Sequence, residues 1–329
     1  MTRLVVAPNR PRYRQAPVVL RRARPMMGTL VGITVRGDDP EMLEDLVRRM
    51  FGEIGRLEGI LSEWQPGSAV SAVNRAAGKS PVQIPSELVE VMQLADQVAR
   101  ATSGAFDTTW SALAEIWKLE TPGFKPPESK TIAVAQGLVD YRDILLDAKA
   151  ETLFLRQAGM RLGLGGVAKA FVAEQAADFA VASGAHDVLV DAGGDLVARG
   201  RNGRRRWTVG IRDPRLEGSL LATANLCDEA IATSGYYEHF ADVDGHRYHH
   251  ILDPRTGTPA SKSRSVTVIA QNGALADALA TGLFVLGPEG LNIVPSFDHV
   301  AALVVDTDGV AHVSAGGAAR FGVKKLRTN

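Results

Sequence analysis

The stretch SVTVIAQNGALADALATGLFVL, residues 265–286, decides the expected fold. Its β-branched beginning, residues 265–270, predicts a strand. The Ala- and Leu-rich segment 274–286 predicts a helix, and Asn272 stands where a side chain caps the first free backbone N–H groups. The same alternation of strand and helix runs through the second half of the chain, which predicts an α+β fold.

Similar patterns extend toward the N-terminus. Alternating side chains over residues 29–35 predict a strand. Asp39 and Pro40 then stand at the cap and the first position of a helix. Ser86 is expected to cap a second helix, and residues 62–78 between the two helices are expected to form a polar loop.

The expected domain organisation follows from the segments that are rich in Pro, Gly or Arg. We expect one α+β domain over residues 25–315, with mixed sheets and flanking helices. The Pro- and Gly-rich segment 121–127 is the clearest internal loop, so a division into two lobes stays open. Residues 1–24, rich in Arg and interrupted by Pro, are expected to form a flexible basic arm, and residues 316–329 a C-terminal tail.

Composition argues against several classes of protein. The 37 Lys and Arg residues balance 37 Asp and Glu residues, so net charge gives no reason to expect a nucleic-acid partner. The single cysteine, Cys227, excludes an intrachain disulfide and a cysteine-based metal site. No run approaches the roughly 18 apolar residues of a membrane helix, so no integral membrane segment is expected.

The N-terminal residues also bear on localisation. Residues 1–24 lack the apolar stretch of a secretory signal. Absence of a leader predicts a cytoplasmic protein. Export or membrane association stays open, as an alternative that applies if a leader is missing from this chain.

Asp277 and Thr281 form the strongest candidate site. On a helix these two positions share one face, so a carboxylate and a hydroxyl project side by side from an apolar element. Both are hard oxygen ligands, the kind that Mg²⁺ uses together with waters and substrate phosphates. The alternative is that Asp277 caps the helix and Thr281 bonds back to a carbonyl, although Asn272 fits the cap better.

A glycine-rich turn, GLGGVAK at residues 163–169, opens another expected helix. Glycines let backbone N–H groups approach phosphates at a helix N-terminus, and Lys169 adds a positive charge. The spacing fits neither G-x-G-x-x-G nor a P-loop, and alone it favours tight packing of a strand against a helix.

Three histidines, His246, His249 and His250, precede a turn at residues 253–257. In one strand His246 and His250 would share a face and His249 would take the other, so the three do not predict a zinc site. An imidazole titrates near neutrality, which makes one of them a candidate general base.

Eight segments, taken in order and spacing, resemble the ApbE family of FAD:protein FMN transferases. They cover about residues 25–290. The matching segments are Met27-Gly28-Thr29, Leu61-Ser62-Glu63-Trp64 with Ser68, Ser71 and Asn74, and residues 104–109, 164–169, 191–195, 232–236, 250–257 and 276–281.

The resemblance implies a T-fold-like domain and an activity. Family members use Mg²⁺ to transfer FMN from FAD to a Thr or Ser hydroxyl of an acceptor protein, often a subunit of a redox complex, and AMP leaves. The implied metal ligands are Asp277, Thr281 and a backbone carbonyl near Gly166, and His250 is our candidate base. The implied FAD contacts are Met27, Trp64, Ala105, Phe106, Asp107, Lys169 and His250.

One departure from the family pattern keeps other functions open. Gly163 stands where the family commonly has Asp, so an acidic nucleotide contact is expected to be absent. The alternatives are an FAD pyrophosphatase, which forms FMN and AMP, and a weakly active FAD-binding protein. Replacing Gly163 by Asp is expected to tighten FAD binding if the backbone tolerates a side chain there.

Overall fold

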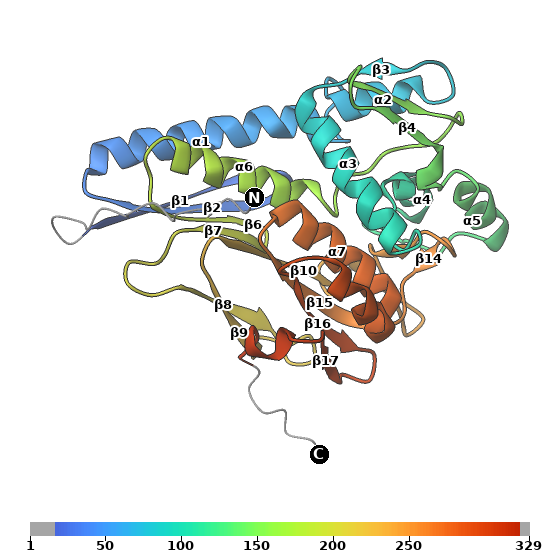
Figure 1. The fold of residues 1–329 in the computed structure, drawn as a ribbon. Helices are drawn as coiled ribbons and strands as arrows, with labels where there is room; N and C mark the ends of the chain where they lie inside the picture. Colours follow the sequence, from blue (N-terminus) through green and yellow to red (C-terminus); the bar gives the residue numbers. More distant parts are fainter. Residues whose placement is uncertain (1–16, 323–329) are drawn as a thin grey trace.

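A large antiparallel sheet organises the protein, whose computed structural model describes residues 17–322 (Figure 1). Within these residues the sheet has eight strands, and every neighbouring pair runs antiparallel. From edge to edge the strands are β1 Val18–Met26, β2 Thr29–Gly37, β6 Asp187–Ala192, β7 Asp195–Arg199, β10 Glu229–Gly235, β15 Ser263–Ala270, β16 Ala301–Asp306 and β17 Ala311–Val313. Because β2 pairs with β6, the sheet joins distant parts of the sequence.

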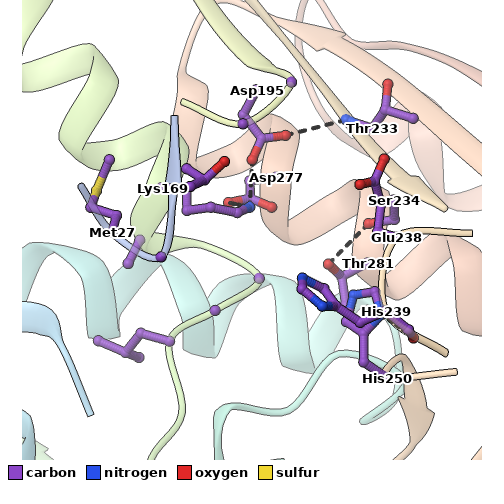
Figure 2. A pocket seen from close by; sticks show the side chains of 18 of the residues that line it. Met27, Lys169, Asp195, Thr233, Ser234, Glu238, His239, His250, Asp277 and Thr281 are labelled. Atoms are coloured by element: carbon purple, nitrogen blue, oxygen red, sulfur yellow. Dashed lines mark hydrogen bonds and ion pairs between the residues drawn. The ribbon is translucent and has the colours of Figure 1, made fainter. Parts of the chain in front are cut away.

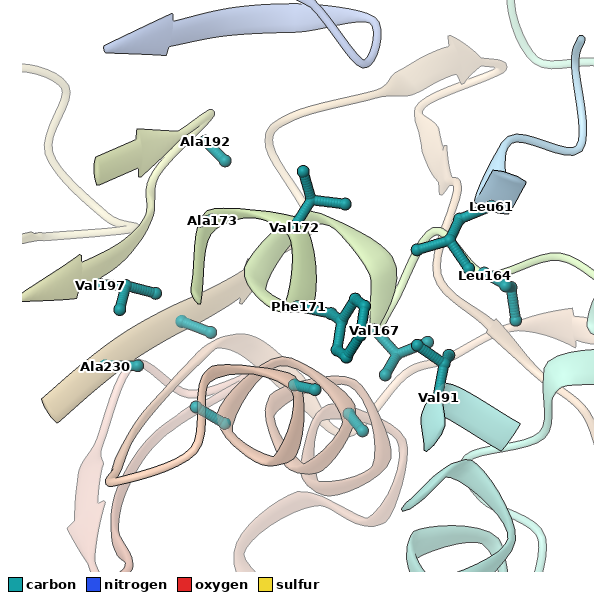
Figure 3. Packing of buried hydrophobic residues seen from close by; sticks show 14 of the residues in the cluster. Leu61, Val91, Leu164, Val167, Phe171, Val172, Ala173, Ala192, Val197 and Ala230 are labelled. Carbon is teal, nitrogen blue, oxygen red and sulfur yellow. The ribbon is translucent and has the colours of Figure 1, made fainter. Parts of the chain in front are cut away.

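Helices cover one face of this sheet. The helix α1 Pro40–Leu61 lies over β1 and β2, α6 Ala168–Ala182 over β6 and β7, and α7 Gly273–Leu286 over β10 and β15. Another helix, α3 Ser86–Ala101, packs against α7. Figure 3 shows Phe171 and Val172 of α6 within the buried cluster formed by these layers. Since α6 and α7 lie side by side, the turn that precedes α6 comes close to the polar face of α7.

A smaller layer extends one end of the molecule. It contains a sheet of β3 Val82–Gln83, β5 Thr152–Leu155 and β4 Ile144–Asp147. Its helices are α2 Ala69–Ala76, α4 Ser111–Trp117 and α5 Ser129–Gln136. Leu153 and Leu155 of β5 belong to the same buried cluster as the residues between the main sheet and its helices. One continuous core therefore joins the layers, and the predicted single α+β domain is confirmed.

A hairpin covers part of the opposite face of the main sheet. It consists of β8 Trp207–Arg212 and β9 Leu220–Leu226, and it forms a second, smaller buried cluster with side chains of β10 and β16. The remaining elements are short strands and 3₁₀ turns, of which η1 and β13 contribute residues to the cavity described below. They are η1 Thr108–Trp110, η2 Tyr141–Asp143, β11 Phe240–Val243, β12 His246–His249, β13 Leu252–Asp253, β14 Thr258–Pro259, η3 Gly287–Ser296 and η4 Gly317–Ala319.

The helix starts agree with the sequence in two of three cases. Asp39 accepts backbone N–H groups at the start of α1, and Asn272 accepts the Leu275 N–H at 2.7 Å at the start of α7, so both caps are confirmed. The expected cap at Ser86 is wrong. Ser86 is already the first residue of α3 and makes no capping bond, because Pro85 occupies the cap position.

The prediction of a flexible arm over residues 1–24 is wrong for residues 18–24. They form most of β1, whose backbone groups pair with β2, and the Arg24 guanidinium lies 4.5 Å from the centre of the Phe51 ring. Tertiary pairing therefore overrides the basic composition of this segment. The rest of the predicted arm, residues 1–16, lies outside the described residues.

The predicted tail also begins within the fold. Phe321 is buried against the β8–β9 hairpin and forms an isolated bridge with Ala224. Only residues 323–329 of the predicted tail lie outside the described residues.

The expected polar loop at residues 62–78 contains a helix instead. Ser68 caps α2 by accepting the Ser71 N–H at 3.0 Å, and the same hydroxyl donates to the Ser62 carbonyl at 2.5 Å. The polar residues that suggested a loop are thus the ones that fix the start of this helix.

One segment of the described chain, Gly273–Ser296, is long and apolar enough to cross a membrane by length and composition. Within the fold, 67% of its most apolar window is buried. Its hydrophobicity is accounted for by packing, since α7 lies between the main sheet and α3.

Candidate active site

A cavity of about 860 Å³ opens where α6, α7, β10 and the turn between β1 and β2 meet. Figure 2 shows polar side chains from several of these elements around it. Ligand pockets typically measure roughly 300–1,000 Å³, so this one is large enough for a cofactor-sized molecule. Its lining includes Met27, Glu63, Trp64, Trp110, Gly166, Lys169, Asp195, Ser234, His239, His250, Asp277 and Thr281.

Asp277 and Thr281 both line this cavity from one face of α7, as their spacing predicts. The Asp277 side chain is buried, and its Oδ2 atom has no hydrogen-bond partner. Burial raises the pKa of Asp277 to about 7, although the nearby Lys169 ammonium opposes this shift. The Thr281 hydroxyl lies 3.3 Å from the Ser234 hydroxyl. The cap interpretation of Asp277 is therefore wrong.

Lys169 connects two buried acids at the start of α6. Its Nζ donates to Asp195 Oδ2 at 2.5 Å and lies 3.8 Å from Asp277 Oδ2. Burial alone would lower the pKa of Lys169, but the two carboxylates outweigh this effect and raise it. The other Asp195 oxygen accepts the Thr233 N–H at 3.3 Å. Asp195 thus holds the ammonium by a hydrogen bond, while Asp277 Oδ2 faces it at 3.8 Å and has no hydrogen-bond partner.

The oxygen donors at this end suit a hard divalent cation. A Cβ atom added to Gly166 would lie 2.8 Å from Thr281 Oγ1, so the glycine turn approaches the α7 hydroxyl closely. The unpaired Asp277 oxygen, the Thr281 hydroxyl and the adjacent backbone match the ligand types that Mg²⁺ prefers. Among residues 17–322 no group of three His, Cys, Asp or Glu side chains is placed to hold a metal. An ion here would therefore depend on hydroxyl, carbonyl, water or phosphate oxygens as well.

His250 lines the cavity, but it lies just after β12 and not within a strand. Its backbone N–H donates to the His239 carbonyl at 3.0 Å, and its Nδ1 is 3.2 Å from the same oxygen. Because a carbonyl only accepts, we assign the proton to Nδ1, which leaves Nε2 as the free acceptor. Burial lowers the pKa of His250 to about 4, so the imidazole is neutral at physiological pH.

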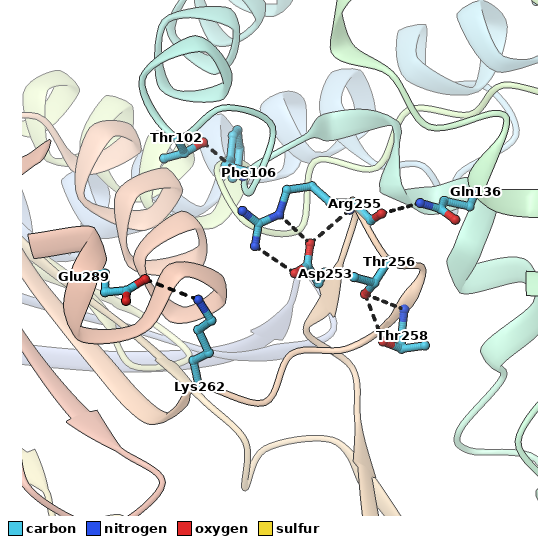
Figure 4. Close-up of polar contacts among 9 residues, drawn as sticks. All are labelled: Thr102, Phe106, Gln136, Asp253, Arg255, Thr256, Thr258, Lys262 and Glu289. Carbon is cyan, nitrogen blue, oxygen red and sulfur yellow. Dashed lines mark hydrogen bonds and ion pairs between the residues drawn. The ribbon is translucent and has the colours of Figure 1, made fainter. Parts of the chain in front are cut away.

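The other two histidines are separated from His250. His249 is buried with Nε2 2.9 Å from the Ala260 carbonyl, and its ring meets the Phe284 ring edge to face. His246 is exposed at the start of β12. The expected turn at residues 253–257 is confirmed, and Figure 4 shows the Arg255 guanidinium bonded to Asp253 within it.

Two predicted FAD contacts, Met27 and Trp64, lie at the cavity. Met27 and Gly28 form the two-residue turn between β1 and β2 with φ values of 53° and 69°, as such hairpin turns require. The Met27 N–H donates to Glu58 Oε1 at 3.0 Å, which fixes the turn. Trp64 is 78% exposed at the cavity wall, so its indole is available for stacking.

The predicted contacts Ala105, Phe106 and Asp107 do not line the cavity. All three are buried, and Figure 4 shows the bond from the Phe106 N–H to Thr102. Asp107 caps η1 by accepting the Thr109 N–H at 2.8 Å, and it also accepts the Tyr141 N–H at 2.8 Å. In this structure the three residues lie outside the cavity lining, and their contact with FAD stays a prediction.

Sequence reasoning missed the contact between Gly163 and Glu63. A Cβ atom at residue 163 would lie 2.5 Å from Glu63 Oε2, which is closer than side-chain contacts allow. We expected Gly163→Asp to tighten FAD binding if the backbone tolerates a side chain there. That condition is not met, since the position has no room for a side chain.

Sequence reasoning also missed His239. It lines the cavity, and its Nδ1 lies 3.1 Å from Glu120 Oε1. No local pattern marks either contact, because each joins segments about 100 residues apart or more.

Comparisons with known proteins agree over most of the chain. A sequence model described as the ApbE family matches residues 27–304. An FAD:protein FMN transferase of Treponema pallidum is 34% identical over 313 residues, covering 90% of this chain and 86% of that protein. An FAD:protein FMN transferase of Klebsiella pneumoniae is 32% identical, covering 75% of this chain and 77% of that protein.

Solved structures have the same fold. The ApbE protein of Thermotoga maritima superposes with a TM-score of 0.83 at 30% identity, covering 91% of this chain and 98% of that one. The apo flavinyl transferase ApbE of Pseudomonas stutzeri gives a TM-score of 0.81 at 28% identity, covering 94% and 98% of the two chains.

Proposed function

This chain belongs to the ApbE family, and from that premise we propose that it is an FAD:protein FMN transferase. It moves FMN from FAD to a Thr or Ser hydroxyl of an acceptor protein, with Mg²⁺ as cofactor and AMP as second product. The names of the similar curated proteins support the transfer. The observation that carries the rest of the proposal is the buried Asp277 carboxylate, which has one oxygen without a hydrogen-bond partner and lies beside Lys169 and Thr281 in a cofactor-sized cavity.

The proposed reaction balances without a nucleophile from this chain. The acceptor oxygen forms a bond to the FMN phosphorus, and the bond from that phosphorus to the bridging oxygen of the pyrophosphate breaks. The hydroxyl proton is removed, and AMP leaves with the bridging oxygen. Such a transfer needs positioning and charge stabilisation more than covalent catalysis.

The α7 face and the glycine turn supply the polar groups for the pyrophosphate. We propose that the Asp277 carboxylate, the Thr281 hydroxyl and a backbone carbonyl near Gly166 hold Mg²⁺. When bound, the ion supplies positive charge for the phosphates and the leaving oxygen. Lys169 adds a second positive charge within 3.8 Å of Asp277. The neighbouring Asp195 keeps this ammonium in place.

His250 is proposed as the base that takes the proton of the acceptor hydroxyl. Its neutral form is favoured by burial, and the bond at Nδ1 leaves Nε2 free for the proton. A base must reach the proton that it removes, and the position of His250 in the cavity lining supports this role.

The test is incubation of the protein with FAD, Mg²⁺ and a peptide that carries a family-type acceptor Thr. We expect the peptide to gain the mass of FMN with loss of water, in equal amount to the AMP released. A peptide with Ala in place of that Thr and a reaction with EDTA are the controls. Free FMN and AMP without a peptide adduct would indicate an FAD pyrophosphatase. Bound FAD without turnover would indicate a binding protein.

A further inference from the structure

Glu63 is a partly buried acid with one buried carboxylate oxygen, and the proposed mechanism has no use for it. It lies in the segment between α1 and α2 and lines the cavity. Its Oε2 atom is buried without a hydrogen-bond partner. A buried polar atom left unpaired costs free energy, and native proteins contain few of them. A ligand that supplies a donor would account for this one.

The carboxylate of Glu63 fills the space beside Gly163. A Cβ atom at residue 163 would lie 2.5 Å from Glu63 Oε2, 2.8 Å from Ser111 Cβ and 3.0 Å from Trp110 Nε1. Trp110 Nε1 already donates to the Gly163 carbonyl at 2.9 Å, so the indole does not satisfy Glu63. Glycine is therefore the residue that leaves room for this acid.

The helix α2 holds both partners of this contact. The Ser71 hydroxyl donates to the Glu63 carbonyl at 3.2 Å. The Asn74 side chain donates to the Leu162 carbonyl at 3.0 Å and accepts the Leu162 N–H at 2.7 Å. Because one helix fixes residue 63 and the residue before Gly163, the acid is placed by backbone contacts and not only by its own rotamer.

The surroundings of Glu63 favour a neutral donor over a cation. Within the described residues Glu63 forms no ion pair, and the nearby Arg161 is paired with Glu115 at 3.2 Å. Burial raises the pKa of Glu63 to about 7, while the Leu164 N–H and Arg161 oppose this shift. A carboxylate without its own cation repels phosphates, so its partner belongs to an uncharged part of a ligand.

We propose that Glu63 binds the nucleotide substrate, with its carboxylate accepting a hydrogen bond from an uncharged N–H or O–H group of FAD. That group belongs to the adenosine part or to the flavin part. The inference rests on the proposed function, because FAD is the ligand. Glu63 then supplies the acid that the family pattern places at residue 163. Gly163 leaves room for this acid and does not indicate weak binding.

The experiment measures FAD dissociation constants by flavin fluorescence, with thermal unfolding of each variant as a check on the fold. Glu63→Gln keeps the side-chain volume and removes the charge, so we expect about fivefold weaker binding. Glu63→Ala removes the acceptor, and we expect binding to weaken roughly 10- to 100-fold. Glu115→Gln is the matched control, since Glu115 lies beside Arg161 but does not line the cavity, and its affinity should change less than about twofold.

Titrations with AMP and with FMN identify the donor. Weaker binding of AMP to Glu63→Gln assigns it to the adenosine part, and weaker binding of FMN assigns it to the flavin part. Either result supports the proposal. Unchanged FAD affinity in both Glu63 variants, in a wild type that binds FAD and transfers FMN, overturns this inference and leaves the proposed function intact. A wild type that does not bind FAD overturns both.

Discussion

Two acids, the buried Asp277 and the partly buried Glu63, stand at different ends of the cavity, and their neighbours differ. At the α7 end, Asp277 lies 3.8 Å from the Lys169 ammonium and one helical turn from the Thr281 hydroxyl. At the glycine-turn end, Glu63 lies against Gly163 and Trp110, without an ion pair among the described residues. Burial raises the pKa of both acids to about 7, and each has one buried oxygen without a hydrogen-bond partner.

The difference shows that burial alone does not assign a role to an acid. Desolvation makes both carboxylates costly to ionise until a partner arrives. At the α7 end the adjacent hydroxyl and backbone oxygens fit a metal ion, whereas at the glycine-turn end no cation pairs with Glu63 within the described residues, which favours a neutral donor. The groups that surround each acid therefore predict the kind of ligand that it binds. The predictions below test this contrast in order of decreasing effect.

The largest effect is expected for Asp277→Ala. Loss of a metal ligand removes several kcal/mol of transition-state stabilisation, so FMN transfer should fall by roughly 10³-fold or more. The melting temperature should change little, because Asp277 Oδ2 has no hydrogen-bond partner and Asp195 still holds the Lys169 ammonium. Mg²⁺ titration by calorimetry should show loss of binding.

Asp277→Asn is the matched control, because it keeps the size and shape of the side chain and removes only its charge. It should lose Mg²⁺ binding almost as completely as the alanine variant. Glu63→Gln should bind Mg²⁺ like the wild type, which separates the two ends. If Asp277→Ala transfers FMN at the normal rate in Mg²⁺, the metal assignment at the α7 end is wrong.

His250→Ala should slow FMN transfer by roughly 10²-fold or more, the usual contribution of a general base. FAD affinity should change less, because Lys169 and the Asp277 site remain. Since burial lowers the pKa of His250 to about 4, the base becomes neutral as pH rises through that value. At saturating Mg²⁺ the wild-type rate should therefore show an ascending limb near pH 4, and the variant should lose this limb.

A pH–rate profile of single turnovers measures this limb directly. His250→Asn keeps a donor for the His239 carbonyl, so it separates a role in the turn from a role as base. Near-normal transfer by His250→Asn would move the search for the base to Asp253 or to metal-bound solvent.

A smaller effect is expected for Asp195→Asn, which tests how Lys169 is shared. The ammonium would lose its partner at 2.5 Å and move toward Asp277, where it competes with a cation. Partners that act on a metal site through another residue typically change metal affinity by roughly 10- to 100-fold. Calorimetry with Mg²⁺ measures this change. The control is Asp178→Asn, because Asp178 also lies on α6 but pairs with Arg199 of β7. Unchanged Mg²⁺ affinity would show that Asp195 does not act on the α7 end.

The sequence predicted the α7 end because its signals are local. The shared face of Asp277 and Thr281 and the cap at Asn272 depend on residues within two or three turns of one helix. The glycine turn and Lys169 were also found from local sequence, and the resemblance added their roles in binding FAD and the metal. Local spacing and order were therefore enough for the part of the site that lies on α6 and α7.

The remaining features depend on contacts that no local pattern encodes. The basic segment 18–24 forms part of β1 because β2 supplies its pairing partner. The polar pattern did not predict α2, because Ser68 caps this helix and Ser71 donates to the Glu63 carbonyl. His250 lies outside its expected strand because its backbone turns to the His239 carbonyl. Glu63 and Gly163 meet only after α2 has joined their two segments.

The smallest predicted effect is a coupling energy at the glycine-turn end, measured by a double-mutant cycle. Gly163→Asp alone should lower the free energy of unfolding by about 1–3 kcal/mol, because its Cβ meets Glu63 Oε2 at 2.5 Å. In the Glu63→Ala background that contact is gone, so the loss should be about 1 kcal/mol smaller. Part of the cost remains, because Ser111 Cβ still lies 2.8 Å from the new Cβ.

Denaturant unfolding of the four proteins in this cycle gives the coupling, and FAD titration gives its functional counterpart. The double variant should bind FAD more tightly than Glu63→Ala, because an acid has returned to the same space from the other segment. Gly165→Ala is the control substitution, since its Cβ would meet only the Trp110 ring at 3.8 Å and should show no coupling to Glu63. Additive effects of the Gly163 and Glu63 changes on both stability and affinity would mean that the two residues do not share one site. The glycine-turn end would then differ from the α7 end in having no ligand role, and Glu63 would be a partly buried acid that the fold tolerates without using it.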